Sequence, residues 1–149
     1  MIRYLSVAAL VAAGATFAYA QGVTGPAAIA QRKEAMKAVG GANKGLTAMS
    51  KGEEAFDAAK ATAGFKIIED NFIKAKGLFP DDSKTGGETT AMPAIWEKKA
   101  DFMAKFDKAI ADVKAAGAAS KDEASFKEQF KGAVSNCGGC HKEYRQPPK

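Results

Sequence analysis

The residues of this chain that could do metal or redox chemistry lie in one short string near the C-terminus, Cys137-Gly138-Gly139-Cys140-His141. The chain has one His and two Cys, so its thiols and its imidazole all fall within these five residues. Two thiols at this spacing, followed directly by His, form the attachment pattern of c-type haem. Cys137 and Cys140 are therefore expected to form thioether bonds to one haem c, and His141 to supply an axial nitrogen to its iron.

Other interpretations of the two cysteines make different demands on the sequence. A redox dithiol calls for a strand-to-helix context, whereas the residues around Cys137 have helical periodicity. A structural zinc site takes about four Cys and His ligands, and the chain holds only three such residues. A disulfide between Cys137 and Cys140 stays open at this point.

The first twenty residues have the organisation of a secretory signal peptide. Arg3 gives a positive start, residues 5–17 are mostly apolar, and residues 18–20 read Ala-Tyr-Ala, an A-x-A cleavage site. A membrane anchor is the alternative, but the apolar run is shorter than the ~20 residues needed to span a bilayer. We expect residues 1–20 to be a signal peptide that directs export to the periplasm, and residues 21–149 to form one domain. Covalent haem attachment takes place after export, so the expected signal peptide and the haem motif support each other.

The charge balance says little about large polyanionic partners. The formal net charge is +5, and removal of Arg3 with the leader lowers it to +4. This excess is too small to indicate nucleic-acid binding, and two haem propionates would lower it further. Lysines alternate with acidic residues along helical faces, as on a solvated surface. A weakly basic patch at the haem edge would suit an acidic redox partner. No later segment is apolar enough to span a membrane.

The mature chain reads as four amphipathic helices without a β-rich stretch, which predicts an all-α fold. The expected starts are Pro26, a Ser50-x-x-Glu53 capping box, Pro93 and a Ser120-x-x-Glu123 capping box. The second helix is expected to end near Gly77 and the third near Gly117, with residues 78–92 as a long polar connection. Gly40-Gly41 interrupts the first pattern but need not end that helix. This order predicts an antiparallel four-helix bundle.

The last predicted helix carries the haem motif on its apolar face. Cys137 and His141 are four residues apart, so they lie one above the other on that face. We therefore expect the haem to bind inside the bundle, against the inner side of the C-terminal helix. The residues that share this face are Phe126, Phe130, Ala133, Cys137, Cys140 and Tyr144.

With these features the chain resembles the class II c-type cytochromes, the group of cytochrome c′ and cytochrome c-556. The likeness spans residues 21–145. It rests on the haem motif extended to Arg145, on a Pro-Ala-Ile-Trp segment ending at Trp96, and on the stretch from Arg32 to Met36. No Met follows Cys140, which separates the chain from mitochondrial-type cytochromes, whose Met ligand lies downstream of the motif.

The resemblance implies roles for individual residues. Cys137 and Cys140 match the thioether positions and His141 the proximal ligand. Arg32 matches a basic residue near the haem propionates, and Arg145 one beside the proximal His; ordinary surface charge is the alternative for both. Trp96 matches an aromatic residue near the bundle end, for which core packing is the simpler role.

The family divides at the sixth coordination position of the iron. Cytochrome c′ members have an apolar or aromatic residue four positions after the first-helix Arg, and their iron is five-coordinate and high-spin. The c-556 members have Met there, and their iron is six-coordinate and low-spin. Here Met36 lies four residues after Arg32, so the resemblance implies Met36 as the sixth ligand. A core methionine is the alternative role for Met36, and Met92 is a rival ligand.

Different functions follow from these two coordination states. With His/Met ligation, the protein is expected to be a periplasmic electron-transfer haem protein that acts with redox partner proteins. With an open sixth position it is expected to bind nitric oxide or carbon monoxide, like cytochrome c′. A redox sensor or enzyme subunit is a third reading. We find no set of catalytic acid, base and nucleophile, so we expect no enzymatic activity. Family members often dimerise through their first two helices, and a homodimer stays open here.

Overall fold

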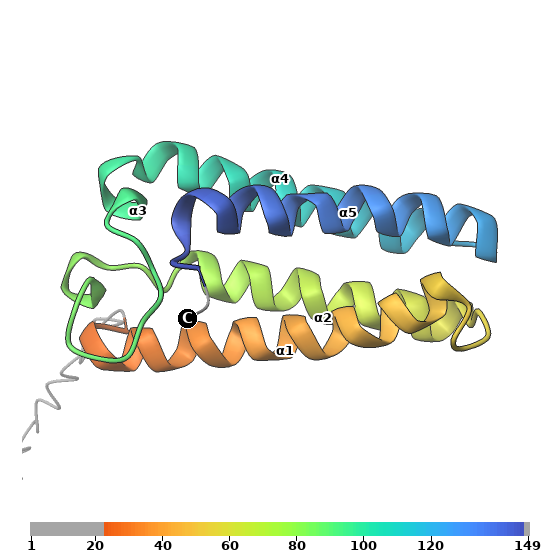
Figure 1. Ribbon diagram of the computed structural model, residues 1–149, viewed down its shortest axis with the longest axis horizontal. Coiled ribbons are helices and arrows are strands. Elements are labelled where there is room, and N and C mark those ends of the chain that lie inside the picture. The colour runs from red at the N-terminus through yellow and green to blue at the C-terminus, as the bar shows by residue number, and fades with distance from the viewer. Residues whose placement is uncertain (1–22, 148–149) are drawn as a thin grey trace, which may run out of the picture.

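Four long helices make up most of the protein, as a computed structural model of residues 23–147 shows (Figure 1). They are α1 (Gly25–Lys51), α2 (Ala58–Lys76), α4 (Lys99–Ala119) and α5 (Glu123–Tyr144). A 3₁₀ turn, η1 (Asp81–Ser83), and a one-turn helix, α3 (Ala94–Glu97), lie between α2 and α4. The expected signal peptide, residues 1–20, lies outside the described residues. Within residues 23–147 no helix combines the length and the apolar character of a membrane span.

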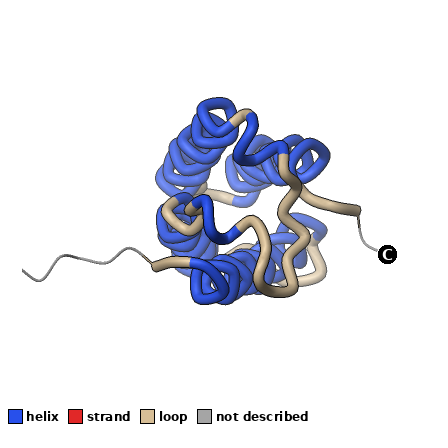
Figure 2. Tube along the Cα trace, turned by 90° about the vertical axis from the view of Figure 1, so that its left-hand side faces the viewer, coloured by secondary structure: helices blue, strands red, loops and turns tan. Residues whose placement is uncertain are grey.

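The long helices are arranged as the four corners of a bundle, seen end-on in Figure 2. Neighbours in sequence are neighbours in space: α1 packs on α2, α2 on α4, and α4 on α5, whereas α1 and α5 contact each other little. Successive helices run in opposite directions, and the loop around η1 and α3 covers one end of the bundle (Figure 1). The predicted antiparallel four-helix bundle is confirmed. Its side between α1 and α5 is the least closed.

The predicted start of the first helix is confirmed, but that of the second is wrong. Pro26 does lie in the first turn of α1, and the helix continues through Gly40-Gly41. Ser50, however, belongs to α1 and does not cap α2. Gly52 adopts the left-handed conformation (φ 76°) and ends α1, because glycine meets no Cβ penalty there. The true cap of α2 is Asp57, whose side chain accepts a hydrogen bond from the Lys60 amide at 2.9 Å.

The predicted boundaries around α4 and α5 also shift. Ser120 is buried and its hydroxyl donates to the Ala116 carbonyl at 2.7 Å, so it ends α4 and does not begin α5. Asp122 caps α5 in a reciprocal bond pattern with Ser125. Gly117 does not stop α4. A Cβ at Gly117 would lie 3.1 Å from the Cβ of Phe65, so this glycine allows α2 and α4 to approach closely.

Pro93 opens α3, but the predicted third helix is not continuous. The backbone leaves helical geometry at Lys98 (φ −116°, ψ 43°), and α4 begins at Lys99. The first four-residue segment therefore turns at an angle to α4, as Figure 1 shows. This break places the Pro93–Trp96 segment at the bundle end, next to the loop that follows α2.

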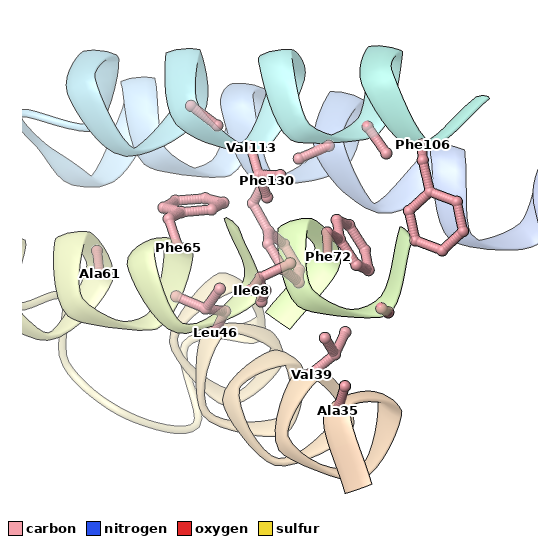
Figure 3. Close-up of a cluster of buried hydrophobic side chains, with 14 of the residues drawn as sticks. Ala35, Val39, Leu46, Ala61, Phe65, Ile68, Phe72, Phe106, Val113 and Phe130 are labelled. Carbon is pink, nitrogen blue, oxygen red and sulfur yellow. The ribbon is translucent and has the colours of Figure 1, made fainter. Parts of the chain in front are cut away.

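Aromatic side chains fill the space between the two helix pairs. Phe65, Phe72, Phe106 and Phe130 are buried and point into this space (Figure 3). Towards the far end from α3, the ring of the fully buried Phe126 lies 5.7 Å from that of Phe130 and 6.2 Å from that of Phe65. The core is therefore continuous from this end to the opening between α1 and α5.

Phe126→Ala is expected to lower the free energy of unfolding by about 3–5 kcal/mol, because it removes a fully buried ring and leaves a cavity. Urea unfolding of the haem-loaded protein measures this loss. Glu128→Ala, at an exposed position of the same helix, should change stability by no more than about 0.5 kcal/mol. Equal effects of the two substitutions would contradict the packing described here.

Candidate haem site

A cavity of about 620 Å³ opens between α1 and α5. Six residues named from the sequence as haem-binding residues line it, although they come from opposite ends of the chain. They are Arg32, Met36, Cys137, Cys140, His141 and Arg145. Met92, the rival sulfur ligand, is not among the lining residues.

The walls of this cavity suit a large apolar group. About half of the remaining lining side chains are aromatic or aliphatic, and they come mainly from α1, α2, α4, the loop after α2, and α3. They include Val39, Phe72, Phe79, Ile95, Phe102, Phe106 and Ala109. A concave apolar site with a few polar groups at fixed places is the usual form of a cofactor site. The donor set also fits haem c, because two thiols and one imidazole lie on the same helix face.

Helix α5 supplies both thiols and the imidazole. Cys137 and Cys140 are half-buried and free, so they are not joined in a disulfide. Burial raises the pKa of both thiols. His141 is accessible along the cavity wall, yet its surroundings desolvate the imidazolium and Arg145 repels it, so its pKa is lowered. His141 is therefore neutral at physiological pH, which is the metal-binding form.

A metal ion without a macrocycle finds little support in this region. In the part of the chain that the structure describes, no group of three or more Cys, His, Asp and Glu side chains could hold a bare metal ion. The zinc interpretation of the Cys-x-x-Cys pair therefore lacks its remaining ligands.

Arg32 is the most constrained charged residue of the site. Its side chain is 4% exposed and donates four hydrogen bonds: to the Leu78 carbonyl (3.2 Å), to the Ser83 hydroxyl and carbonyl (2.8 and 3.0 Å), and to the Thr89 hydroxyl (2.9 Å). The guanidinium also lies 4.8 Å from the centre of the Phe79 ring. All these partners are neutral. Arg32 therefore joins α1 to the loop after α2, and burial lowers its pKa.

Arg32→Leu is expected to destabilise the haem-loaded protein by about 2–4 kcal/mol, because the carbonyls and hydroxyls of residues 78–89 lose their donors inside the protein. Urea unfolding is the measurement. Lys44→Leu, an exposed change on the same helix, is the control and should be nearly neutral. A neutral Arg32→Leu would show that the loop does not depend on this side chain.

The other two positions named from the family resemblance differ in character. Arg145 is exposed, lines the cavity and pairs through its backbone with Ala91 in an isolated antiparallel bridge. Trp96 does not line the main cavity. Its indole donates to the Pro80 carbonyl at 3.2 Å, and its ring contacts Phe79 edge-on at 6.2 Å. Trp96 thus packs the bundle end, and it also lines a smaller outer groove of about 430 Å³.

Two features of the site were missed by the sequence reasoning. Phe79 was placed in a polar connection, but its ring lines the cavity and packs against Phe102 at 4.8 Å. The apolar pair Leu78-Phe79 directly after α2 was the available signal. Tyr144 was assigned only to the apolar face of α5, yet its hydroxyl donates to the Asp101 carboxylate at 2.5 Å. No local pattern indicates a bond between residues 43 positions apart.

Comparisons with known proteins agree with this geometry. The family model described as Cytochrome C′ matches residues 27–145. The chain is 44% identical over 144 residues to a cytochrome c′ of Rhodopseudomonas palustris, covering 97% of this chain and 96% of the relative. It is 39% identical over 118 residues to a cytochrome c-556 of Agrobacterium fabrum, and the match covers 78% of this chain and 80% of that relative. The solved structure of cytochrome c′ from Rhodopseudomonas palustris superposes with a TM-score of 0.79 at 45% identity, and the match covers 82% of this chain and 98% of that structure's chain.

Proposed function

The chain belongs to the cytochrome c′ family, and on that premise we propose that it transfers electrons in the periplasm through one covalently attached haem c with His/Met axial ligation. Haem c is the cofactor of this family and supplies the redox chemistry. The protein's own contribution is to bind the group, choose its axial ligands and exclude water. Residues 1–20 would direct export, after which residues 21–149 form the haem-binding domain.

The proposed ligands are Cys137 and Cys140 for the thioether bonds, His141 for the proximal position and Met36 for the sixth. The observation that carries this proposal is that Met36 and His141 line one cavity from facing helices, α1 and α5. Met92 lacks this support, since it does not line the cavity. A thioether is a soft, neutral ligand that favours ferrous iron. If Met36 and His141 both bind the iron, it would offer no open position to an exogenous ligand.

We assign Arg32 and Arg145 to the carboxylate side of the cofactor. Arg32 is a buried cation whose hydrogen-bond partners are all neutral, and a carboxylate is the group that compensates such a charge best. Arg145 lines the same cavity from the other side, after the end of α5. Between them, the two residues would neutralise the haem propionates.

Gas binding in the manner of cytochrome c′ is the second candidate, favoured by the 44% identical relative of that name. Carbon monoxide added to the reduced, haem-loaded protein separates the two functions. If Met36 ligates the iron, the spectrum should stay essentially unchanged at micromolar carbon monoxide, because the gas must displace the thioether. Rapid and complete formation of the carbon monoxide adduct would refute the electron-transfer proposal.

A homodimer is also proposed, through the outer surface of α1 and α2. Ile67 and Ile73 on α2 are 45% and 54% exposed and are the large hydrophobic side chains with most exposure among residues 23–147. Ile67→Lys/Ile73→Lys should reduce the mass measured by light scattering to that of a monomer, because two buried charges would oppose association. Lys60→Glu/Lys127→Glu, at exposed positions of α2 and α5, should leave the dimer intact. A wild-type protein that is monomeric at 0.1 mM contradicts the proposal.

A further inference from the structure

Beyond the ligand set, we propose that Tyr144 and Asp101 form a positioning pair for the proximal ligand. The bond between them would fix the last turn of α5 against α4 and thereby set the orientation of the His141 imidazole in the cavity. The inference rests on the proposed function in one respect, namely that His141 ligates the haem iron.

The pair links two helices, with a buried phenol on α5 and a half-exposed carboxylate on α4. Tyr144 is 2% exposed, and its hydroxyl donates to Asp101 Oδ2 at 2.5 Å. Its ring contacts that of Phe102 edge-on, with the ring centres 5.0 Å apart. Tyr144 lies three residues after His141, which is less than one helical turn. A displacement of Tyr144 must therefore move the backbone that carries the ligand.

Charge makes this bond strong and keeps it in one protonation state. The Tyr144 hydroxyl is the main cause of the lowered pKa of Asp101, followed by the charge of Lys105. Burial raises the pKa of Tyr144, and Asp101 raises it further. At neutral pH the phenol thus keeps its proton and Asp101 its charge, giving a charge-assisted bond. Asp101 also lies in the first turn of α4, where the helix dipole favours an anion.

Further contacts surround the same turn of α5. Lys105 Nζ lies 3.6 Å from Asp101 and 3.5 Å from Glu143, and Lys98 lies 3.1 Å from Glu143. These ion pairs are partly exposed and each contributes little. The Tyr144–Asp101 bond has a buried donor and a half-exposed acceptor, so it is better shielded from water than these ion pairs and holds this turn more firmly.

Backbone hydrogen bonds also hold the C-terminal end of α5. The Met92 amide donates to the Tyr144 carbonyl at 3.0 Å, and the Gln146 amide to the Thr90 carbonyl at 2.8 Å. On the N-terminal side of His141, the Asn136 side chain donates to Asp112 of α4 at 2.8 Å, and the proposed thioether bonds of Cys137 and Cys140 would restrain the helix there. The residues that follow His141 hold it from the other side, and the Tyr144–Asp101 bond is their side-chain contact to α4.

The test compares Tyr144→Phe, which keeps the ring and removes only the hydroxyl, with Asp101→Ala, which removes the acceptor. Proton NMR of the ferric, haem-loaded protein supplies the readout, since the pattern of the four haem-methyl shifts reports the orientation of the axial imidazole. Both variants should change this pattern in the same way. Amide exchange at Arg145, whose N–H bonds to the His141 carbonyl at 3.1 Å, should become about tenfold faster, as expected for the loss of one such bond.

Controls separate positioning from general destabilisation. Asp101→Asn keeps a carbonyl acceptor and should restore most of the wild-type pattern. Lys98→Gln breaks the ion pair to Glu143 in the same region and should leave the pattern unchanged. The double variant Tyr144→Phe/Asp101→Ala should show no more change than Asp101→Ala alone, because Asp101→Ala already removes the bond that Tyr144→Phe removes.

Wild-type haem-methyl shifts in Tyr144→Phe, or additive changes in the double variant, would overturn the positioning role. The proposed electron-transfer function fails in a different way, through a high-spin spectrum of the unaltered protein. Haem-methyl shifts can be measured in either spin state, so the two failures are distinguishable.

Discussion

The double variant Cys137→Ala/Cys140→Ala is expected to lose covalent haem altogether. The unaltered protein, made with a cytochrome c maturation system, should exceed its chain mass by one haem and keep its colour through acid–acetone extraction. The variant should have the mass of the bare chain and release any bound haem to the solvent, because no thioether bond remains. Mass spectrometry and extraction measure both properties. Ser135→Ala, at an exposed position two residues before the motif, should behave like the unaltered protein.

The same change should also impair folding. Without its cofactor the bundle has a cavity of about 620 Å³ walled by apolar side chains, and the ligand's binding free energy no longer stabilises the native state. We expect the cofactor-free protein to unfold with low cooperativity and to expose apolar surface. A native-like, cooperative melt of the cofactor-free form would contradict a core-filling haem, and complete acid–acetone extraction from the unaltered protein would contradict covalent attachment.

Met36→Ala is expected to convert the iron from low-spin to high-spin at neutral pH. The substitution removes the thioether and leaves space on the side of the cavity opposite His141. The reduced variant should bind carbon monoxide readily. Its reduction potential should fall by on the order of 0.1 V, within the ~0.8 V range that axial ligands span, because the ligand favouring ferrous iron is gone. Visible spectra and a redox titration measure these changes.

Met92→Ala is the matched control for this substitution. Met92 is half-buried but does not line the cavity, so its replacement should leave the spectrum unchanged. A low-spin spectrum in Met36→Ala together with a high-spin spectrum in Met92→Ala would assign the sixth position to Met92.

The sequence predicted the bundle because its evidence is local and repeated. Apolar residues at helical spacing recur over four segments, and Pro26 and Pro93 mark true helix starts. The helix starts predicted at Ser50 and Ser120 are wrong because the pattern Ser-x-x-Glu can also occur where the serine still belongs to the preceding helix. Ser50 continues α1 until Gly52 ends it, and Ser120 bonds backwards to Ala116. Which serine caps a helix depends on the backbone angle at that residue, which the pattern does not contain.

In the candidate site, too, the residues that are adjacent in the sequence could be predicted, and the contacts between distant residues could not. Cys137, Cys140 and His141 can be read from the sequence because the chemistry requires them to be adjacent. The partners of Arg32 could not be predicted, since Leu78, Ser83 and Thr89 lie 46 to 57 residues away. Their contact depends on the path of the loop after α2, which no periodic pattern encodes.

The visible and near-infrared spectrum of the unaltered, haem-loaded protein tests the central claim most directly. His/Met ligation by His141 and Met36 predicts sharp low-spin bands in both oxidation states and a weak near-infrared thioether–iron band in the ferric form. A broad high-spin spectrum without that band would contradict the claim and assign the protein to gas binding with an open sixth position.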